Sequence, residues 1–185
     1  MLIVSNPTAE QLPCAVTASP VAKDPLKRAM DVLVAGGALL FFAPLLALVA
    51  VLIKLESPGP VLFRQARGGL NGQAFTIFKF RSMRCQENGA NVVQAKRDDD
   101  RITTIGRILR KTSIDELPQL LNVLKGDMSI VGPRPHALAH DEHYGAVIPN
   151  YHLRFRTRPG LTGLAQIKGL RGGTSAVEAM AARVD

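Results

Sequence analysis

The stretch from Val32 to Ile53 reads VLVAGGALLFFAPLLALVAVLI and is the feature of the sequence that decides the fold. It has no charged or strongly polar side chain over roughly 20 residues, the length of helix that spans a bilayer core. Leu, Ile, Val and Phe each favour insertion by about 0.3 to 0.6 kcal/mol, so together they outweigh the roughly 3 kcal/mol that Pro44 costs. The stretch starts far from Met1 and has no small-residue cleavage site, so we expect a retained membrane segment.

Basic residues flank this segment on both sides, with Lys27 and Arg28 before it and Lys54 and Arg64 after it. The positive-inside rule therefore draws both ends to the cytoplasm. Pro44 lies mid-segment, where it removes a backbone N–H and favours a kink. We predict a re-entrant helix-break-helix, and a simple kinked span stays open as the alternative.

At the start of the segment, Arg28 and Asp31 are three residues apart and could pair. A solvated helix start is the alternative. These two residues and Pro44 are our candidate residues of the membrane hairpin.

The whole chain has 185 residues, which suits one domain. Its net charge of +8 and pI near 10.0 favour an anionic partner such as phosphate, nucleic acid or lipid. Cys14 and Cys85 are far apart and form no CxxC pair, so neither a disulfide framework nor a cysteine zinc site is supported, and a reducing, cytosol-facing environment fits best.

Outside the membrane segment the pattern changes several times. Residues 1–26 are expected to form a loose tail before a domain that covers residues 27–185. Apolar residues at 61–63 and 75–80, on either side of Asn71-Gly72, predict a β-hairpin. Residues 85–100 are polar and predict a surface loop or lid. The fold class is therefore predicted as α+β, predominantly helical, with a membrane-embedded re-entrant helix and a cytosolic domain that contains a small β-hairpin.

Two further helices are predicted after the polar loop. Apolar and basic residues alternate at helical spacing over 102–111, which is typical either of a helix on a membrane surface or of a core-facing helix with a solvated basic side. The next helix is predicted to begin at Ser113 and to end near Gly126.

Two adjacent acids, Asp115 and Glu116, stand in the first turn of that predicted helix. Ser113 and Glu116 match a capping box, in which Glu116 would only bond back to the Ser113 backbone. A helix N-terminus also stabilises an ionised carboxylate, the form required of a nucleophile or a magnesium ligand. Two acids in a chain this rich in Arg and Lys suggest metal-assisted phosphate chemistry.

From Lys27 onward the chain resembles the bacterial sugar transferase family, the monotopic phosphoglycosyl transferases that move a sugar phosphate from a nucleotide sugar to undecaprenyl phosphate. The resemblance is carried by five motifs: Lys27-Arg-x-x-Asp31, Phe78-Lys-Phe-Arg-Ser-Met83, Arg110-Lys-Thr-Ser-Ile-Asp-Glu-Leu-Pro-Gln119, Gly126-Asp-Met-Ser-Ile-Val-Gly-Pro-Arg-Pro135 and Arg158-Pro-Gly-Leu-Thr-Gly-Leu-Ala-Gln166.

The resemblance implies that Asp115 is the nucleophile, that Glu116 is its acidic partner, and that Mg²⁺ binds at both. It also implies that Arg134 contacts the phosphates of a UDP-sugar. The basic residues that we expect to bind substrate are Lys79, Arg81, Arg110, Arg134 and Arg158. The product would be a lipid-linked sugar that starts exopolysaccharide or other glycoconjugate assembly, with UMP released.

The expected location is the inner (cytoplasmic) membrane, with the catalytic domain facing the cytoplasm. Expected partners are a UDP-sugar, undecaprenyl phosphate and membrane lipid; downstream glycosyltransferases and a second copy of the chain are further candidates. Nucleic acid is not expected, because aromatic residues are only 5% of the chain and there is no Trp for base stacking.

Two alternative functions stay open. A membrane-tethered basic protein that binds nucleic acid or lipid fits the net positive charge, and a nucleotide-sugar hydrolase could use the same two acids. His136, His140 and His143 would share a face if Pro135 began a helix, which makes zinc a minor candidate.

The sequence departs from the family pattern at two places. Ala43 stands where the family often has Ser. The chain stops at Asp185 in a helix-like stretch (175–184) where the family continues, so we expect a shortened form.

Overall fold

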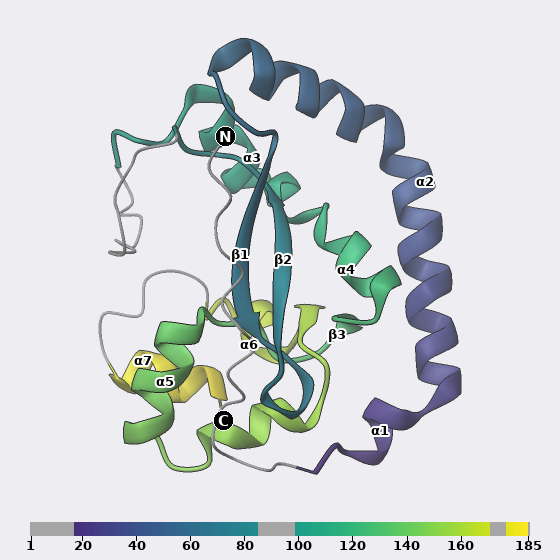
Figure 1. Ribbon diagram of the computed structural model, residues 1–185, viewed down its shortest axis with the longest axis vertical. Coiled ribbons are helices and arrows are strands. Elements are labelled where there is room, and N and C mark those ends of the chain that lie inside the picture. Colours follow the sequence, from purple (N-terminus) through teal and green to yellow (C-terminus); the bar gives the residue numbers. More distant parts are fainter. Residues whose placement is uncertain (1–16, 85–98, 171–176, 185) are drawn as a thin grey trace.

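The computed structural model describes residues 17–84, 99–170 and 177–184. A long helix runs along one side, a β-hairpin lies in the middle, and shorter helices surround the hairpin (Figure 1). The helices are α1 (Pro20–Lys23), α2 (Pro25–Glu56), α3 (Thr104–Thr112), α4 (Gln119–Lys125), α5 (Leu138–Val147), α6 (Leu164–Ile167) and α7 (Val177–Val184), with 3₁₀ segments η1 (Leu70–Gly72), η2 (Ile114–Glu116) and η3 (Tyr151–Arg156). The strands are β1 (Leu62–Gly68), β2 (Ala74–Phe80), β3 (Ser129–Val131) and β4 (Gly160–Thr162).

Helix α2 is continuous for 32 residues and contains Pro44. Asp24 caps its start, because the carboxylate accepts a hydrogen bond from the Leu26 backbone N–H at 2.8 Å. The ribbon bends along its course (Figure 1), as expected when an internal proline removes one hydrogen bond. The predicted helix-break-helix is therefore a single bent helix in this structure, with no interruption at Pro44.

The segments predicted to be irregular are only partly described. Within the predicted tail, residues 20–23 form α1, Asp24 caps α2, and residues 25 and 26 are the first two residues of α2. Residues 1–16 and 85–98, which include most of the predicted tail and lid, lie outside the described residues.

The predicted β-hairpin is confirmed. Strands β1 and β2 pair antiparallel along their whole lengths. The chain reverses through η1, where Asn71 has φ 56° and Gly72 has φ 73°. Asn and Gly tolerate this left-handed conformation better than other residues, which explains their use at the turn.

The helix predicted from Ser113 to Gly126 is divided. Ser113 has φ 59° and ends α3, a 3₁₀ turn follows as η2, and α4 begins only after Pro118. A proline is well placed at a helix start, because the N–H that it lacks would have no partner there. Gly126, with φ 96°, ends α4 as predicted.

Three clusters of buried apolar side chains form the core. The first joins α2 to β2 and α4 through Ala35, Ile77, Leu120, Val123 and Met128. The second joins the later part of α2 to β2 and α3 through Val49, Ile53, Phe80 and Leu109. The third joins α5, η3 and α7 through Tyr144, Ile148, Tyr151, Phe155 and Met180. Helix α2 therefore contributes to the first two clusters and not to the third.

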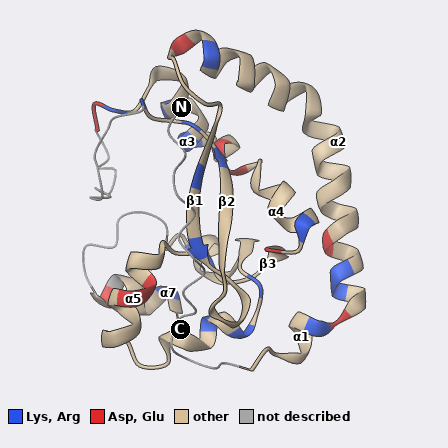
Figure 2. Cartoon of the chain, in the orientation of Figure 1, with Lys and Arg blue, Asp and Glu red and all other residues tan. Residues whose placement is uncertain are grey.

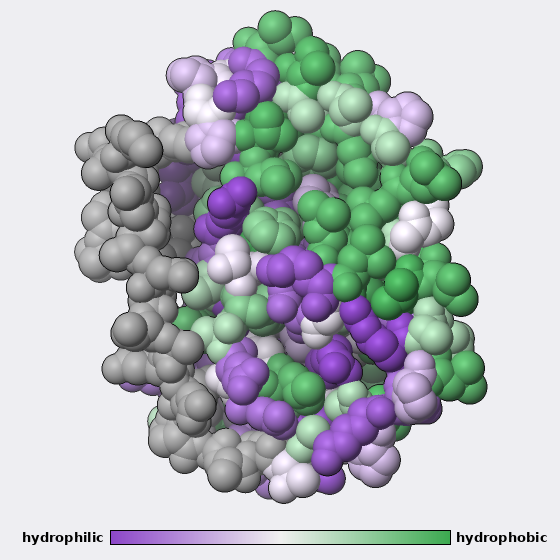
Figure 3. Space-filling view, turned by 45° about the vertical axis from the view of Figure 1, so that its right-hand side comes forward, coloured by the Kyte–Doolittle hydropathy of each residue, from purple (hydrophilic) through white to green (hydrophobic). Residues whose placement is uncertain are grey.

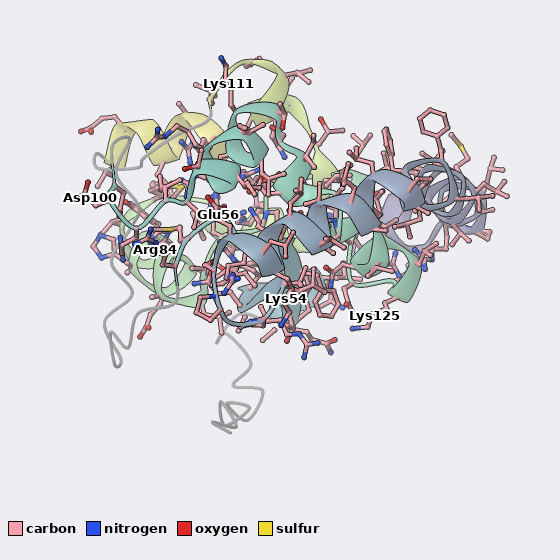
Figure 4. The ribbon with its side chains drawn as sticks, turned by 90° about the horizontal axis from the view of Figure 1, so that it is seen from above. Lys54, Glu56, Arg84, Asp100, Lys111 and Lys125 are labelled. Atoms are coloured by element: carbon pink, nitrogen blue, oxygen red, sulfur yellow. The ribbon has the colours of Figure 1, made fainter. Side chains whose placement is uncertain are left out.

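Helix α3 packs mainly against the core. Leu109 is buried and Ile105 packs against the second cluster, whereas Ile108 is exposed. Glu56, at the end of α2, lies beside α3 (Figure 4), and its carboxylate accepts a hydrogen bond from the Ile105 backbone N–H at 3.1 Å. The core-facing alternative therefore describes Leu109 and Ile105, whereas the exposed Ile108 is available for another contact.

The outer face of α2 is apolar and exposed. Leu40 is 80% exposed and Phe41 is 78% exposed. Charged residues occur on α2 only near its two ends (Figure 2), and apolar side chains form a broad continuous surface along it (Figure 3). Among the described residues, α2 is the one helix long and apolar enough to cross a membrane. An exposed apolar surface of this size is rare on a protein that is surrounded by water, so it indicates membrane association.

Candidate active site

The two acids lie in η2, at the junction between α3 and α4. The backbone N–H of Glu116 donates to the carbonyl of Ser113 at 3.1 Å, which closes the 3₁₀ turn. The Ser113 side chain makes no capping hydrogen bond. The capping-box interpretation is therefore wrong: Ser113 adopts a left-handed conformation, and the Glu116 side chain points to other partners.

Those partners are two cations from distant parts of the chain. Lys79, on β2, places Nζ 2.8 Å from Glu116 Oε1. Arg134 contacts the same carboxylate with both terminal nitrogens, at 2.7 Å to Oε1 and 3.2 Å to Oε2. A two-point guanidinium–carboxylate pair fixes both side chains in orientation as well as distance.

This arrangement sets the charge of Glu116. Burial by itself would favour the neutral acid, but the hydrogen bonds and positive charges of Arg134 and Lys79 outweigh it and lower the pKa of Glu116 to about 2. Burial also lowers the pKa of Lys79, although Glu116 opposes that effect. Glu116 is therefore an ionised and fully engaged carboxylate.

Asp115 differs from its neighbour. Among the residues that the structure describes, no group of another residue hydrogen-bonds to the Asp115 carboxylate. Burial raises the pKa of Asp115 and the charge of Glu116 adds to this, while Lys79 and Arg110 oppose it. Because its pKa is raised, the Asp115 carboxylate is more basic than that of Glu116. Among the described residues, no cation hydrogen-bonds to it. Asp115 is thus the acid of the pair that is available for chemistry.

Arg134 lies on a loop whose backbone is held at several points. The loop follows β3, which pairs in parallel with β4, and the Pro133 carbonyl accepts from the Gly160 N–H at 2.9 Å. The Arg134 carbonyl accepts from the guanidinium of Arg154, and the Pro135 carbonyl accepts from Arg67 at 3.4 Å. Prolines on both sides of Arg134 restrict it further, so its side chain starts from a fixed point.

Arg154 is in turn held by a buried polar cluster. Its guanidinium donates to the Tyr151 hydroxyl at 2.7 Å and to His136 Nδ1. The Tyr151 hydroxyl donates to Asp141 Oδ1 at 2.8 Å. The sequence did not predict a role for Asp141 or Tyr151, because their helix and 3₁₀ segment meet the Arg134 loop only in the folded chain.

Of the predicted substrate-binding residues, Lys79 and Arg134 contact Glu116 directly. Arg110 is exposed on α3 and influences Asp115 through its charge. Arg81 and Arg158 do not contact the acids in this structure and instead donate to backbone carbonyls. Arg81 is buried and donates to carbonyls at the end of α2, including that of Ser57 at 2.7 Å.

Arg158 binds backbone carbonyls as well. It donates to Gly126 at the end of α4 at 2.9 Å and to Ala22 in α1 at 2.5 Å. Both arginines satisfy carbonyls that a helix end leaves without an intrahelical partner, so their role in this structure is to hold helix ends.

The predicted pairing of Arg28 with Asp31 is also wrong. Arg28 donates to the carbonyls of Val123 and Leu124 at the end of α4, at 2.6 and 2.8 Å. Asp31 is buried and pairs with Lys27 at 2.5 Å. The alternative of a solvated helix start fails too, since the Asp31 carboxylate also accepts from the Ile130 backbone N–H at 3.0 Å.

The donor groups in the described residues limit where a metal ion could bind. In the described part of the chain no three His, Cys, Asp or Glu side chains come together as a metal cluster, so the minor zinc candidate has no support there. His136 precedes α5 and is buried against Tyr151, so it does not share a helix face with His140 and His143. Mg²⁺ commonly uses one or two carboxylates with waters and substrate phosphates. Asp115 fits that role, whereas Glu116, occupied by Lys79 and Arg134, does not in this arrangement.

Comparison with curated proteins gives close relatives. The chain is 63% identical over 164 residues to the UDP-glucose:undecaprenyl-phosphate glucose-1-phosphate transferase of Caulobacter vibrioides, which covers 89% of this chain and 61% of the relative. It is 52% identical to the Escherichia coli protein of the same description, over 86% of this chain and 34% of the relative. It is 54% identical to the exopolysaccharide production protein PSS of Rhizobium leguminosarum, over 86% of this chain and 82% of the relative.

The chain therefore spans less than two thirds of the length of the first two relatives. The family model described as bacterial sugar transferase matches residues 22–185, which is nearly all of the chain. Because the family model covers nearly the whole chain and the relatives are 52 to 63% identical to it, the chain belongs to the bacterial sugar transferase family.

Proposed function

We propose that this chain transfers a sugar 1-phosphate from a UDP-sugar to undecaprenyl phosphate and releases UMP. The single observation that carries the proposal is the contrast between the two acids: Glu116 is held by two cations, and Asp115 beside it accepts no hydrogen bond from another described residue. The names of the relatives support the substrate classes, since they include transferases of glucose 1-phosphate and of N-acetylgalactosamine phosphate to undecaprenyl phosphate. UDP-glucose is the first donor to test.

The proposed reaction has two displacements at one phosphorus atom. In the first, a carboxylate oxygen of Asp115 bonds to the phosphorus that carries the sugar, the bond from that phosphorus to the UMP oxygen breaks, and UMP leaves. In the second, an oxygen of undecaprenyl phosphate bonds to the same phosphorus, and the bond to Asp115 breaks. The carboxylate is restored and a diphosphate links the lipid to the sugar. An ionised carboxylate needs no base to remove a proton first.

The cations around Asp115 have a defined task in this scheme. Donor, acceptor and nucleophile are all anionic, so they repel one another in the absence of positive charge. Lys79 and Arg134 both interact electrostatically with Asp115 and are fixed by their contacts with Glu116. Positive charge held in place before the substrates bind stabilises the transition state without further reorganisation.

The experiment is UMP release by the purified chain in detergent, with Mg²⁺, UDP-glucose and undecaprenyl phosphate. We expect release that depends on the lipid, is abolished in Asp115→Asn, and is unchanged in Glu142→Gln, which alters an exposed acid on α5. Equal release without lipid would identify a nucleotide-sugar hydrolase. Absence of release in the unsubstituted chain, together with salt-sensitive oligonucleotide binding, would favour the binding-protein alternative.

A second measurement addresses the covalent step. Without lipid, the first displacement should still occur, so rapidly quenched protein should gain the mass of a hexose phosphate on Asp115. Lipid-dependent turnover with no adduct on Asp115, and with Asp115→Asn still active, would exclude the two-step route.

We also propose that Mg²⁺ binds here through Asp115 and the donor phosphates. When bound, the ion would offset negative charge on the phosphates. The expected result is loss of UMP release in EDTA and recovery on addition of Mg²⁺; full activity in EDTA would remove the metal from the proposal.

The bent α2 is proposed to enter and leave the inner membrane on the cytoplasmic side. Basic residues at both ends of α2 and the bend in its ribbon support this. In a variant without Cys14 and Cys85, single cysteines introduced at Lys23 and at Ser57 should both resist a membrane-impermeant thiol reagent applied to spheroplasts and react after lysis. Labelling of one of them in intact spheroplasts would show a full span.

A further inference from the structure

Arg154, in η3, differs from Arg81 and Arg158 in the backbone carbonyl that it binds. Those two arginines donate to carbonyls at the ends of helices. Nη2 of Arg154 donates to the carbonyl of Arg134, which lies in the loop between β3 and α5. This acceptor is not part of a helix, and it belongs to the residue that holds Glu116. The contact therefore links Arg154 to the acid pair through one intermediate residue.

The other terminal nitrogen of Arg154 lies in a buried polar cluster. Nη1 donates to the Tyr151 hydroxyl at 2.7 Å and to His136 Nδ1, and it lies 3.7 Å from Asp141 Oδ1. The side chain of Arg154 is 7% exposed, and that of Asp141 is fully buried. Burial raises the pKa of Tyr151, so its hydroxyl keeps the proton that it donates to Asp141 at 2.8 Å. The cluster thus fixes one nitrogen of the guanidinium, and the other reaches the Arg134 carbonyl.

Two aromatic rings further restrict the guanidinium of Arg154. Its Cζ atom lies 5.0 Å from the centroid of the Tyr151 ring and 5.8 Å from that of the Phe155 ring. A planar guanidinium with contacts in two directions has a fixed orientation, whereas a lysine ammonium at this place could reach only one set of partners. Buried ion pairs add little net stability compared with apolar packing, so a fixed orientation is the property that this cluster supplies.

We propose that Arg154 is a positioning residue for sugar phosphate transfer: it fixes the backbone of Arg134, and so places the Arg134 guanidinium relative to the acid pair. This rests on the function proposed above, in which Arg134 offsets negative charge near Asp115. Tyr151 and Asp141 act one step further away, because they hold Arg154. A displaced Arg134 lowers the rate, since a charge that stabilises the transition state must be in place before that state forms.

The decisive variant is Arg154→Lys. It keeps a positive charge beside Asp141, but one ammonium cannot bind both the cluster and the Arg134 carbonyl. With the full chain in detergent, UDP-glucose and undecaprenyl phosphate, kcat for UMP release should fall about tenfold or more while KM for UDP-glucose changes less than about threefold. Arg156→Lys, the same substitution at an exposed position on η3, is the matched control and should change kcat less than about twofold. A kcat of Arg154→Lys equal to that of the parent would overturn the proposal.

A double-mutant cycle separates positioning from a general effect on the fold. If Arg154 acts through Arg134, Arg154→Lys should lower kcat less than about twofold when Arg134→Gln is already present. The same fold-change in both backgrounds would mean that Arg154 acts independently of Arg134, and it would overturn the proposal. Tyr151→Phe removes only the hydroxyl that holds Arg154, so it should lower kcat several-fold and show the same non-additivity. It takes the place of Arg154→Lys if that variant does not fold.

Hydrogen exchange separates this outcome from that of the proposed function. In Arg154→Lys, the backbone amides of residues 129–137 should exchange faster than in the parent, whereas those of α3 should not change. If this occurs but the parent shows no lipid-dependent UMP release, the link between Arg154 and Arg134 stands and the function is wrong. If exchange and kcat are both unchanged while the parent transfers, the link is wrong and the function stands. Faster exchange throughout the chain would show a general loosening and would also overturn the proposal.

Discussion

The Arg134 guanidinium donates two hydrogen bonds to the Glu116 carboxylate, at 2.7 Å to Oε1 and 3.2 Å to Oε2, although the two residues are eighteen positions apart in the sequence. The pair joins the turn that carries the acids to the loop after β3. Lys79 completes it from the hairpin at 2.8 Å. Both cations are directed at Glu116, and within the described part of the chain no other residue hydrogen-bonds to the Asp115 carboxylate, which lies near the positive charges of Lys79 and Arg110.

The two acids should therefore respond differently to neutralisation. Glu116→Gln breaks a largely buried charge network and leaves Lys79 and Arg134 without their counter-ion, so we expect a loss of about 3 kcal/mol in the free energy of unfolding. Asp115→Asn removes a carboxylate whose ionisation burial opposes, so stability should be unchanged or higher while UMP release is lost. Urea unfolding in detergent measures the first and the transfer assay the second. Equal destabilisation by both variants would contradict this division of roles.

The low pKa of Glu116 predicts a pH dependence of stability. Folding lowers this pKa from 4.5 to about 2, so the stabilisation is complete above the unfolded-state value and is lost as the pH falls from about 4.5 to about 2. A shift of this size corresponds to a contribution on the order of 3 kcal/mol. Acid unfolding in EDTA should show this loss, and Glu116→Gln should lack it. The same acid profile in both proteins would exclude Glu116 as its source.

Two glycines in helices should give opposite results when replaced by alanine. A Cβ at Gly106 would overlap the carbonyl oxygen of Ser82, two residues after β2, so Gly106→Ala must push α3 away from this segment. We expect a loss of about 1 to 3 kcal/mol in the free energy of unfolding. A Cβ at Gly37 would meet nothing within 4 Å, so Gly37→Ala is the matched control and should leave stability unchanged or raise it by up to about 1 kcal/mol. A neutral Gly106→Ala, measured by thermal unfolding, would show that α3 does not pack this closely.

Asn122 should be the residue that fixes the hairpin to α4. Its buried side chain accepts from the Phe78 N–H at 3.0 Å and donates to the Thr76 carbonyl at 2.7 Å. Asn122→Leu leaves two backbone groups without partners, so we expect a loss of about 2 to 4 kcal/mol. Leu121→Ala, at a partly exposed position on the same helix, should cost less than about 1 kcal/mol. Similar losses for the two variants in urea unfolding would contradict this role of Asn122.

Several features were set by the sequence because they depend on local patterns. An apolar run as long as Val32 to Ile53 forms a helix suited to lipid wherever the rest of the chain lies. Asn71-Gly72 supplies the conformations that a hairpin turn requires, and Gly126 ends its helix for the same reason. The order of the motifs identified the family, and the adjacency of Asp115 and Glu116 identified the candidate acids.

Local patterns also misled where two conformations fit the same residues. Ser113 and Glu116 have the spacing of a capping box, but Ser113 adopts φ 59° and the Glu116 side chain turns to Lys79 and Arg134. The ion pairs with Lys79 and Arg134 stabilise the Glu116 carboxylate more than a hydrogen bond to the nearby backbone would. Nothing within the motif itself distinguishes the two outcomes.

Only the tertiary structure decided which basic residues lie beside Asp115 and Glu116. Arg28, Arg81 and Arg158 carry the same charge as Arg134, and the sequence gives no basis for separating them. In the folded chain these three lie near the ends of helices, where backbone carbonyls have no intrahelical partner, and they bind those carbonyls. Arg134 and Lys79 meet a carboxylate because β2, η2 and the loop after β3 converge there. A long basic side chain takes the nearest acceptor, and which acceptor is nearest depends on the packing of elements that are distant in sequence.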